Sequence, residues 1–489
     1  MQRTLCIHGH FYQPPRENPW TGDVEREDSA SPFHDWNERV TAECYAPNAA
    51  ARLYEKISFD FGPTLLAWLE RKAPEVYRSV LAADRESLRR FSGHGSAIAQ
   101  AYNHMILPLA NARDKRTQIL WGLRDFEHRF GRSPEGMWLP ETAVDVETLE
   151  ILSEMGIRFT ILSPRQARAV HRIHDHYWFD VSEGIIDPAM PYRVELPSGR
   201  HVTVFFYDEA VSRAVAFEGL LHDGETFVQR LMNAFSDDRE WPQLVHIATD
   251  GETFGHHHKF GEMALAYALE KIEAGGLVRL TNYGEYLSRM APTHQVEIRE
   301  NTSWSCPHGV ERWRSDCGCR AGGQDEWRQA WRGPLREALD WLRDTLASPF
   351  EVAASEYVKE AWEARDDSLE VVLNPSQRIK EPFFVRHAVR DLSLSEQTKV
   401  LTLMELQRFL MLMYTSCGWF FSDPSDLGTL QVLKYAARAV QMAEEIFGAP
   451  LREDFRNRLQ GVKGNLPGLQ DGRRLFDAFI GPYLAKGRG

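Results

Sequence analysis

Residues 244–258 read LVHIATDGETFGHHH, and this stretch decides the fold class. Its first half, 244–249, has the apolar composition of a buried strand, and Asp250, Gly251 and Glu252 follow it directly. The pattern then predicts a helix over 263–274. A buried strand, a polar turn and a helix are the repeating unit of a parallel α/β sheet, whose strands carry active-site residues at their carboxyl ends.

The same alternation runs through about the first 300 residues. The expected strands are 4–7, 57–61, 97–99, 136–139, 157–162, 202–207 and 244–249. The other expected helices include 64–71, 114–130 and 145–155, the last of which Gly156 closes. Segment 164–200 is less regular, and we interpret it as a lid-like insertion. The sequence therefore predicts an α/β fold with a mainly parallel sheet, either doubly wound or closed as a barrel.

The pattern changes after Gly333. Apolar residues recur at helical spacing within 335–342, 400–411 and 430–440, while strand patterns fade. In the last of these the next apolar position is taken by Glu444, so its stripe ends in a polar turn. We predict a catalytic α/β domain over residues 1–320 and a mainly helical domain over 330–489.

The composition argues against two classes of partner. The chain has 489 residues, 43% of them hydrophobic, and a net charge of −13 without a basic block, which disfavours nucleic acid and anionic lipid. No apolar run has the length of a membrane span, and the N-terminus reaches His8 before a signal-peptide core could form. We expect a soluble cytoplasmic protein with no nucleic-acid or membrane partner, and the composition does not define its oligomeric state.

Polar residues directly after the expected strands are the candidates for chemistry. Two strand ends supply one carboxylate each, Glu141 and Asp250, while others supply His8, His10 and His104. A pair of carboxylates with aromatic and imidazole side chains around it is what a glycosidase requires, with one nucleophile and one acid/base.

Five segments in this order resemble the five sequence regions of glycoside hydrolase family 57, whose members act on α-glucans as amylases, glucanotransferases and branching enzymes. The segments are 8–14 (HGHFYQP), 102–108 (YNHMILP), 136–141 (GMWLPE), 248–256 (ATDGETFGH) and, more loosely, 303–313. The likeness covers about the first 315 residues, and the remainder is similar to an uncharacterised helical domain of one subgroup. The resemblance implies a (β/α)7 barrel and a retaining mechanism on an α-glucan or maltooligosaccharide.

The resemblance also implies roles for single residues. Glu141 matches the nucleophile and Asp250 the acid/base. The expected substrate-binding residues are His8, His10, His104, Trp138, Glu252, Trp304 and Trp313. For the three Trp residues a core position is the alternative to a sugar platform. No cofactor is expected for catalysis, and both hydrolysis and transglycosylation remain open because they share the covalent intermediate.

Two other functions compete with this one. A metal-dependent polysaccharide deacetylase would use His8, His10, Asp250 and the histidines 256–258, but it has no need of Glu141. A glucan-binding protein that has lost turnover could keep the same fold, although both carboxylates are present.

A separate cluster of soft ligands overlaps the fifth segment. Cys306, His308, Cys317 and Cys319 lie within 14 residues, and thiolates with imidazole suit a tetrahedral structural zinc. The spacing departs from the usual two-residue gap between paired ligands. Three thiols in a loop that bind no metal are therefore the alternative, whereas a disulfide is disfavoured in a reducing compartment.

Overall fold

The computed structural model describes residues 2–276, 278–374, 376–468 and 471–486. The chain divides into two compact units, of which unit 1 comprises residues 1–15 and 25–307 and unit 2 comprises residues 16–24 and 308–489. None of the described helices is both long enough and apolar enough to cross a membrane.

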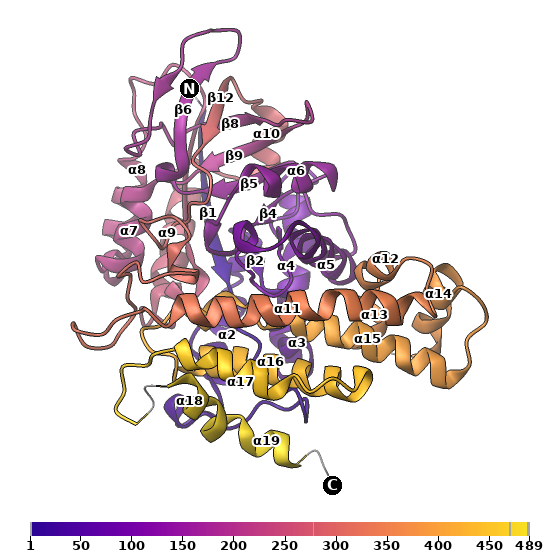
Figure 1. Ribbon diagram of the computed structural model, residues 1–489. Helices are drawn as coiled ribbons and strands as arrows, with labels where there is room; N and C mark the ends of the chain where they lie inside the picture. The colour runs from indigo at the N-terminus through magenta and orange to yellow at the C-terminus, as the bar shows by residue number, and fades with distance from the viewer. Residues whose placement is uncertain (1, 277, 375, 469–470, 487–489) are drawn as a thin grey trace. The chain divides into compact units, whose positions relative to one another are not determined.

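Parallel strands, several of them labelled in Figure 1, form the core of unit 1. The long strand β1 (Arg3–Phe11) pairs with β10 (Gln243–Asp250) on one side and, at its carboxyl end, with β2 (Ser58–Phe61) on the other. The parallel pairing continues from β2 through β3 (Ala99–Gln100), β4 (Met137–Trp138), β5 (Phe159–Leu162) and β9 (His201–Phe206). The amide of Asp208 donates to the carbonyl of His246 at 2.8 Å and joins the end of β9 to β10.

Those strands are the seven parallel segments of a (β/α)7 barrel within the described part of unit 1, and all seven coincide with expected strands. The short β11 (Arg279–Leu280) additionally pairs with the first residues of β1. The helices of unit 1 are α1 (Trp36–Val40), α2 (Ala46–Ala50), α3 (Pro63–Lys72), α4 (Pro74–Arg90), α5 (Ala112–Phe130), α6 (Val146–Glu154), α7 (Glu209–Phe217), α8 (Gly224–Met232), α9 (Gly261–Gly275) and α10 (Tyr283–Arg289).

The helix boundaries follow from capping residues. Asn111 begins α5 and Asp145 begins α6, because each side chain accepts a hydrogen bond from an amide of the first turn. Gly131 ends α5 and Gly156 follows α6, both in the left-handed conformation that glycine adopts without strain. The predicted helices 64–71, 114–130, 145–155 and 263–274 are therefore confirmed as α3, α5, α6 and α9.

The segment 164–200 is more regular than the sequence predicts. It contains β6 (Ala167–Arg172), β7 (Phe179–Asp180) and β8 (Pro191–Glu195). The strand β8 pairs antiparallel with β9, and β12 (His294–Ile298) bridges β8 and β6. The interpretation as an irregular insertion is therefore wrong, because these residues extend the sheet beyond the barrel ring (Figure 1).

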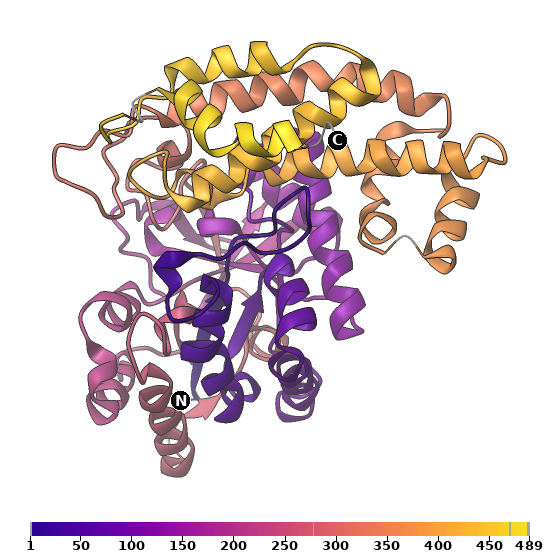
Figure 2. The ribbon, with the colours of Figure 1, turned by 90° about the horizontal axis from the view of Figure 1, so that it is seen from below.

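Unit 2 is helical, as the sequence predicts. Its helices are α11 (Arg332–Ser355), α12 (Ala361–Asp366), α13 (Leu369–Leu373), α14 (Gln377–His387), α15 (Leu394–Leu412), α16 (Leu427–Phe447), α17 (Arg452–Arg458), α18 (Gly472–Phe479) and α19 (Gly481–Lys486). The long helices α11, α15 and α16 run side by side (Figure 2) and bury apolar stripes that include Leu339, Leu403 and Val440. Glu444 ends the last stripe and accepts hydrogen bonds from the amides of Leu451 and Arg452.

Candidate active site

A strained turn follows β4 and carries Glu141. The turn Pro140–Thr142 places Glu141 at φ 58° and Thr142 at φ 51°, a region that residues other than glycine seldom occupy. Such conformations cost about 1–3 kcal/mol each and persist where the surroundings fix them. Here the carbonyl of Glu141 accepts a hydrogen bond from the amide of Trp304 at 3.1 Å, and Thr142 Oγ1 contacts Gln166 Oε1 at 2.9 Å.

Two donors orient the carboxylate of Glu141. Its Oε2 accepts a hydrogen bond from the indole Nε1 of Trp304 at 3.1 Å and another from Ser305 Oγ at 2.6 Å. Glu141 is half-buried, as are both donors. Hydrogen bonds of this kind hold one oxygen in place and stabilise the charged form of the carboxylate.

Asp250 is the last residue of β10 and lies opposite His10 in the strand register. Its side chain is exposed, in contrast to the buried residues before it. The protein atoms packed around Asp250 raise its pKa above the ordinary value, the positive charge of His10 opposes this, and the negative charge of Asp60 adds to the rise. The surroundings therefore favour the protonated form of a carboxyl group that solvent can reach.

A buried network of charged and imidazole groups stands beside Asp250. Asp60 is 0% exposed, and its carboxylate contacts His8 Nε2 at 3.1 Å and His10 Nδ1 at 2.8 Å. His10 Nε2 in turn lies 3.1 Å from His104 Nε2. Burial alone would lower the pKa of His10, but the charges of Asp60, Asp250 and Glu252 raise it to about 9. Burial and the charge of His10 hold the pKa of His104 well below its usual range.

These opposite pKa shifts favour a positively charged His10 beside a neutral His104. In that arrangement His10 Nε2 donates to His104 Nε2. His104 itself adopts φ 57°, another left-handed residue in the segment that follows β3. The ring of Tyr12 stacks on His104 with centroids 3.8 Å apart. The result is a fixed cation beside Asp250.

An aromatic cluster joins the two carboxylates. Trp138 stacks on His10 with ring centroids 4.9 Å apart and on His8 at 5.0 Å, and it meets Trp304 edge-on at 5.0 Å. Since Trp304 donates to Glu141 and His10 neighbours Asp250, both carboxylates border the same cluster. His8 and Trp138 are 0% exposed and lie in its interior, whereas Trp304 is half-buried.

Glu252 is a second carboxyl group close to Asp250. Its Oε1 accepts hydrogen bonds from the amide of Tyr12 at 3.0 Å and from the hydroxyl of Tyr45 at 2.5 Å. Burial, helped by the charge of Asp250, raises the pKa of Glu252 to about 7, against the lowering effects of Tyr45 and His10. Glu252 is only 4% exposed, so of this pair Asp250 is the one open to solvent.

The remaining predicted residues have partners of their own. Trp313 belongs to unit 2, is fully buried, and donates its indole N–H to the carbonyl of Ser416 at 3.2 Å. His256 contacts Glu43 at 2.5 Å and His258 contacts the carbonyl of Ala216 at 2.9 Å, so these histidines are held by protein groups. The cysteine and histidine candidates for a metal, by contrast, come together: the ligand atoms of Cys306, His308, Cys317 and Cys319 all lie within 4.8 Å of one another.

Sequence reasoning missed three contributors to the site. Asp60 is the one charged residue of β2 and lies between two phenylalanines, and that mismatch is the signal that could have revealed it. Ser305 directly follows the predicted Trp304. Tyr45 lies in a π-helical turn, Thr41–Tyr45, and no motif marks it.

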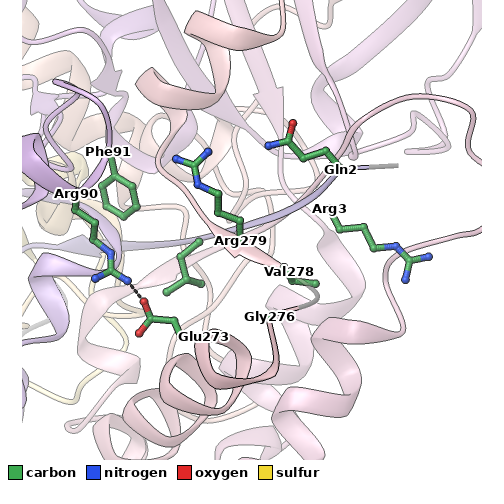
Figure 3. A pocket seen from close by; sticks show the side chains of 9 residues that line it. Gln2, Arg3, Arg90, Phe91, Glu273, Gly276, Val278 and Arg279 are labelled. Atoms are coloured by element: carbon green, nitrogen blue, oxygen red, sulfur yellow. Dashed lines mark ion pairs between the residues drawn. The ribbon is translucent and has the colours of Figure 1, made fainter.

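A pocket at the other end of the strands has a different character. It is lined by Gln2, Arg3, Arg90, Phe91, Glu273, Gly276, Val278, Arg279 and Leu280 (Figure 3). Its three arginines form ion pairs with Asp237, Glu273 and Glu285, respectively. The amino ends of barrel strands serve stability rather than chemistry, and these neutralised charges fit that role.

Comparisons with known proteins agree with this architecture. Residues 26–299 match Glycosyl hydrolase family 57, and residues 327–487 match a Domain of unknown function (DUF3536). The 4-alpha-glucanotransferase of Thermococcus litoralis is 25% identical over 320 residues, which are 63% of this chain and 43% of that protein. The Alpha-amylase of Pyrococcus horikoshii is 26% identical over 320 residues, 63% of this chain and 44% of that protein. The chain thus spans less than half the length of these relatives.

Solved structures share the fold. An exo-type maltose-forming amylase from Pyrococcus sp. ST04 superimposes with a TM-score of 0.70 at 14% identity, covering 99% of this chain and 93% of that one. A family 57 branching enzyme from Pyrococcus horikoshii gives a TM-score of 0.60 at 17% identity, covering 94% and 95%. The family model matches more than half of the residues, and the chain therefore belongs to glycosyl hydrolase family 57.

Proposed function

We propose that this protein is a retaining glycoside hydrolase or transglycosylase that acts on α-glucans, with Glu141 as the nucleophile and Asp250 as the acid/base. The observation that carries the proposal is the pair of carboxyl groups at the ends of β4 and β10. Both border the cluster of His10, Trp138 and Trp304, and their surroundings differ in the way the two roles require.

The first step is attack of a Glu141 oxygen on the anomeric carbon. The bond to the leaving sugar oxygen breaks while Asp250 gives that oxygen its proton, which leaves a glycosyl ester on Glu141 and an ionised Asp250. In the second step Asp250 takes a proton from water or from a sugar hydroxyl, whose oxygen attacks the anomeric carbon and releases Glu141. Two inversions give net retention.

The surroundings support this division of roles. Donors from Trp304 and Ser305 keep Glu141 oriented and stabilise its charge, as a nucleophile needs. The raised pKa of Asp250 favours the proton that a general acid must carry. The charged His10 contacts Asp60 and lies opposite Asp250 in the strand register. There it can stabilise the carboxylate that forms when Asp250 has given up its proton.

The printed names of the relatives support an α-glucan as the substrate class, since they are a glucanotransferase and an amylase. The deacetylase alternative loses support from geometry. Within the described residues the metal-binding arrangement found is the one at Cys306, and it does not include His8, His10 or the histidines 256–258.

Kinetics of two variants test the assignment. Glu141→Gln retains an oxygen for the donors of Trp304 and Ser305 but cannot form the ester, so turnover of maltoheptaose should fall by about a thousandfold or more. Asp250→Asn should slow the turnover of maltoheptaose strongly but that of an activated aryl maltooside little, because only the sugar leaving group of maltoheptaose needs a proton. Glu270→Gln, which changes an exposed carboxylate on α9, is the control.

More than a tenth of the wild-type rate in Glu141→Gln, or equal losses on both substrates in Asp250→Asn, would overturn these roles. The products that the wild-type enzyme forms from maltoheptaose show which acceptor completes the second step. Products that are all shorter than maltoheptaose mean that water resolves the ester, and longer or branched products mean that a sugar hydroxyl does.

A further inference from the structure

A cluster of three thiols and one imidazole occupies the segment 306–319. The Sγ atoms of Cys306, Cys317 and Cys319 and a ring nitrogen of His308 all lie within 4.8 Å of one another. Cys319 Sγ is 3.5 Å from His308 Nδ1. With bonds of about 2.3 Å to sulfur and about 2.0–2.1 Å to nitrogen, a tetrahedral zinc site has a sulfur–nitrogen edge of about 3.6 Å.

The backbone of this segment allows both pairs of ligands to converge. Gly318 separates Cys317 from Cys319 and adopts φ 79°, a conformation that other residues seldom take. Gly309 directly follows His308 and adopts φ 86°. A one-residue gap between ligands is shorter than usual, and the left-handed glycine lets the Cys-Gly-Cys step bend so that the two sulfurs reach one point.

A buried cation complements the charge of the cluster. Arg332 at the start of α11 is 0% exposed, and its Nη1 lies 3.8 Å from Cys317 Sγ and donates to the carbonyl of Cys319 at 3.0 Å. Binding of Zn²⁺ by three cysteines releases their three protons and leaves a net charge of −1 on the site. The guanidinium of Arg332 balances that charge at close range.

We propose that Cys306, His308, Cys317 and Cys319 bind one structural zinc ion. Thiolate and imidazole ligands select zinc over magnesium, calcium and manganese, which prefer oxygen. Four protein ligands leave no open position for water or substrate, so the ion stabilises the segment and takes no part in the reaction.

The site stands next in the chain to residues that hold Glu141. Ser305 and Trp304, which both donate to the Glu141 carboxylate, directly precede Cys306. Fixing Cys306 by a metal therefore limits the freedom of the donors. This consequence rests on the proposed function, whereas zinc binding itself does not depend on it.

Metal analysis of the full-length protein, purified without a histidine tag, tests the site. We expect about one equivalent of zinc per chain in the wild type. The double variant Cys317→Ser/Cys319→Ser should retain less than a tenth of that, while Cys417→Ser, outside the cluster, should retain all of it. Less than a tenth of an equivalent of zinc in the wild type, iron as the main metal, or full zinc in the double variant would overturn the proposal.

Cobalt substitution keeps the test decisive if the double variant does not fold. Wild-type protein stripped by a chelator and given one equivalent of Co²⁺ should develop intense d–d bands in the visible range and sulfur-to-metal charge-transfer bands in the near ultraviolet. Together these bands are the signature of a tetrahedral thiolate site. Weak bands of octahedral Co²⁺ would contradict the ligand set. Chelation should also lower the wild-type melting temperature, because zinc binds the folded chain. Without a chelator, Glu141→Gln should contain as much zinc as the wild type although it has lost turnover.

Discussion

Asp250 and Glu252 form a carboxyl pair whose titration the structure makes testable. The pKa of Glu252 is raised to about 7 and that of Asp250 is also raised, so the pair keeps at least one proton up to about pH 7. The general acid needs that proton. We therefore expect kcat/KM to fall as the pH rises through about 7, while His10, with a pKa of about 9, stays charged over this range.

Replacing Glu252 separates the two groups. In Glu252→Gln the only proton of the pair belongs to Asp250, so the descending limb of the pH profile should move to lower pH. Glu270→Gln serves again as the exposed control. A pH profile of kcat/KM for maltoheptaose that is the same in Glu252→Gln and in wild type would show that the pair shares no titration.

For single residues, the sequence predicts which side chains are candidates for the site but not which residues they contact. Glu141, Asp250 and His10 follow from strand ends and motifs, because a strand end fixes where a side chain emerges. Asp60 and Ser305 were missed, since their roles depend on neighbours 50 and 164 positions away in the chain. The burial of His8 and Trp138 beneath His10 also depends on packing that spacing does not encode.

Among the elements, α5 packs tightly on β3 through Gly122. A Cβ at this position would lie 2.0 Å from the carbonyl oxygen of Gln100, and a backbone atom cannot move aside cheaply. We expect Gly122→Ala to lower the free energy of unfolding by about 1–3 kcal/mol or more. Chemical denaturation followed by circular dichroism measures the change.

Gly275→Ala is the matched helical control. Apart from the chain neighbours and the backbone of α9 itself, no described atom lies within 4 Å of the added Cβ at the exposed end of α9. Alanine should therefore raise the free energy of unfolding by up to about 1 kcal/mol. Equal effects of the two substitutions would mean that α5 does not hold its observed distance from β3.

The elements that the sequence predicts well are those with a strong pattern. The barrel strands and the helices α3, α5, α6 and α9 are local consequences of apolar runs and caps. The strands β6 and β7 are short and mostly half-buried or exposed, and β6 pairs with β12 over 120 positions later. The strand β8 pairs with β12 about 100 positions later. Their pairing cannot be inferred from local periodicity, so the sequence alone does not reveal these strands.

On the scale of the whole molecule, the assignment of residues 16–24 to unit 2 lies beyond sequence reasoning. Trp20 donates its indole N–H to Gln441 at 2.7 Å, and Gln431 donates to the carbonyl of Glu17 at 2.8 Å. Such contacts join residues more than 400 positions apart. The change from strand patterns to helical stripes after Gly333, by contrast, is visible in the sequence because it rests on periodicity alone.

The stereochemistry of the product tests the reaction class of the whole enzyme. Because two inversions occur at the anomeric carbon, an α-linked maltooligosaccharide should first release the α-anomer. Proton NMR in the first minutes, before mutarotation, should show that anomer in excess. An initial excess of the β-anomer would mean a single displacement and would exclude a nucleophilic carboxylate.

The covalent intermediate on Glu141 is the central claim, and trapping it is the most direct test. A maltooligosaccharide fluoride with a fluorine on the reacting ring slows the second step, so the ester should accumulate. Mass spectrometry of the digested wild-type protein should then find one glycosyl unit on the peptide that carries Glu141. A label on Asp250 or Glu252 instead, or turnover of the reagent without any labelled carboxylate, would contradict the account.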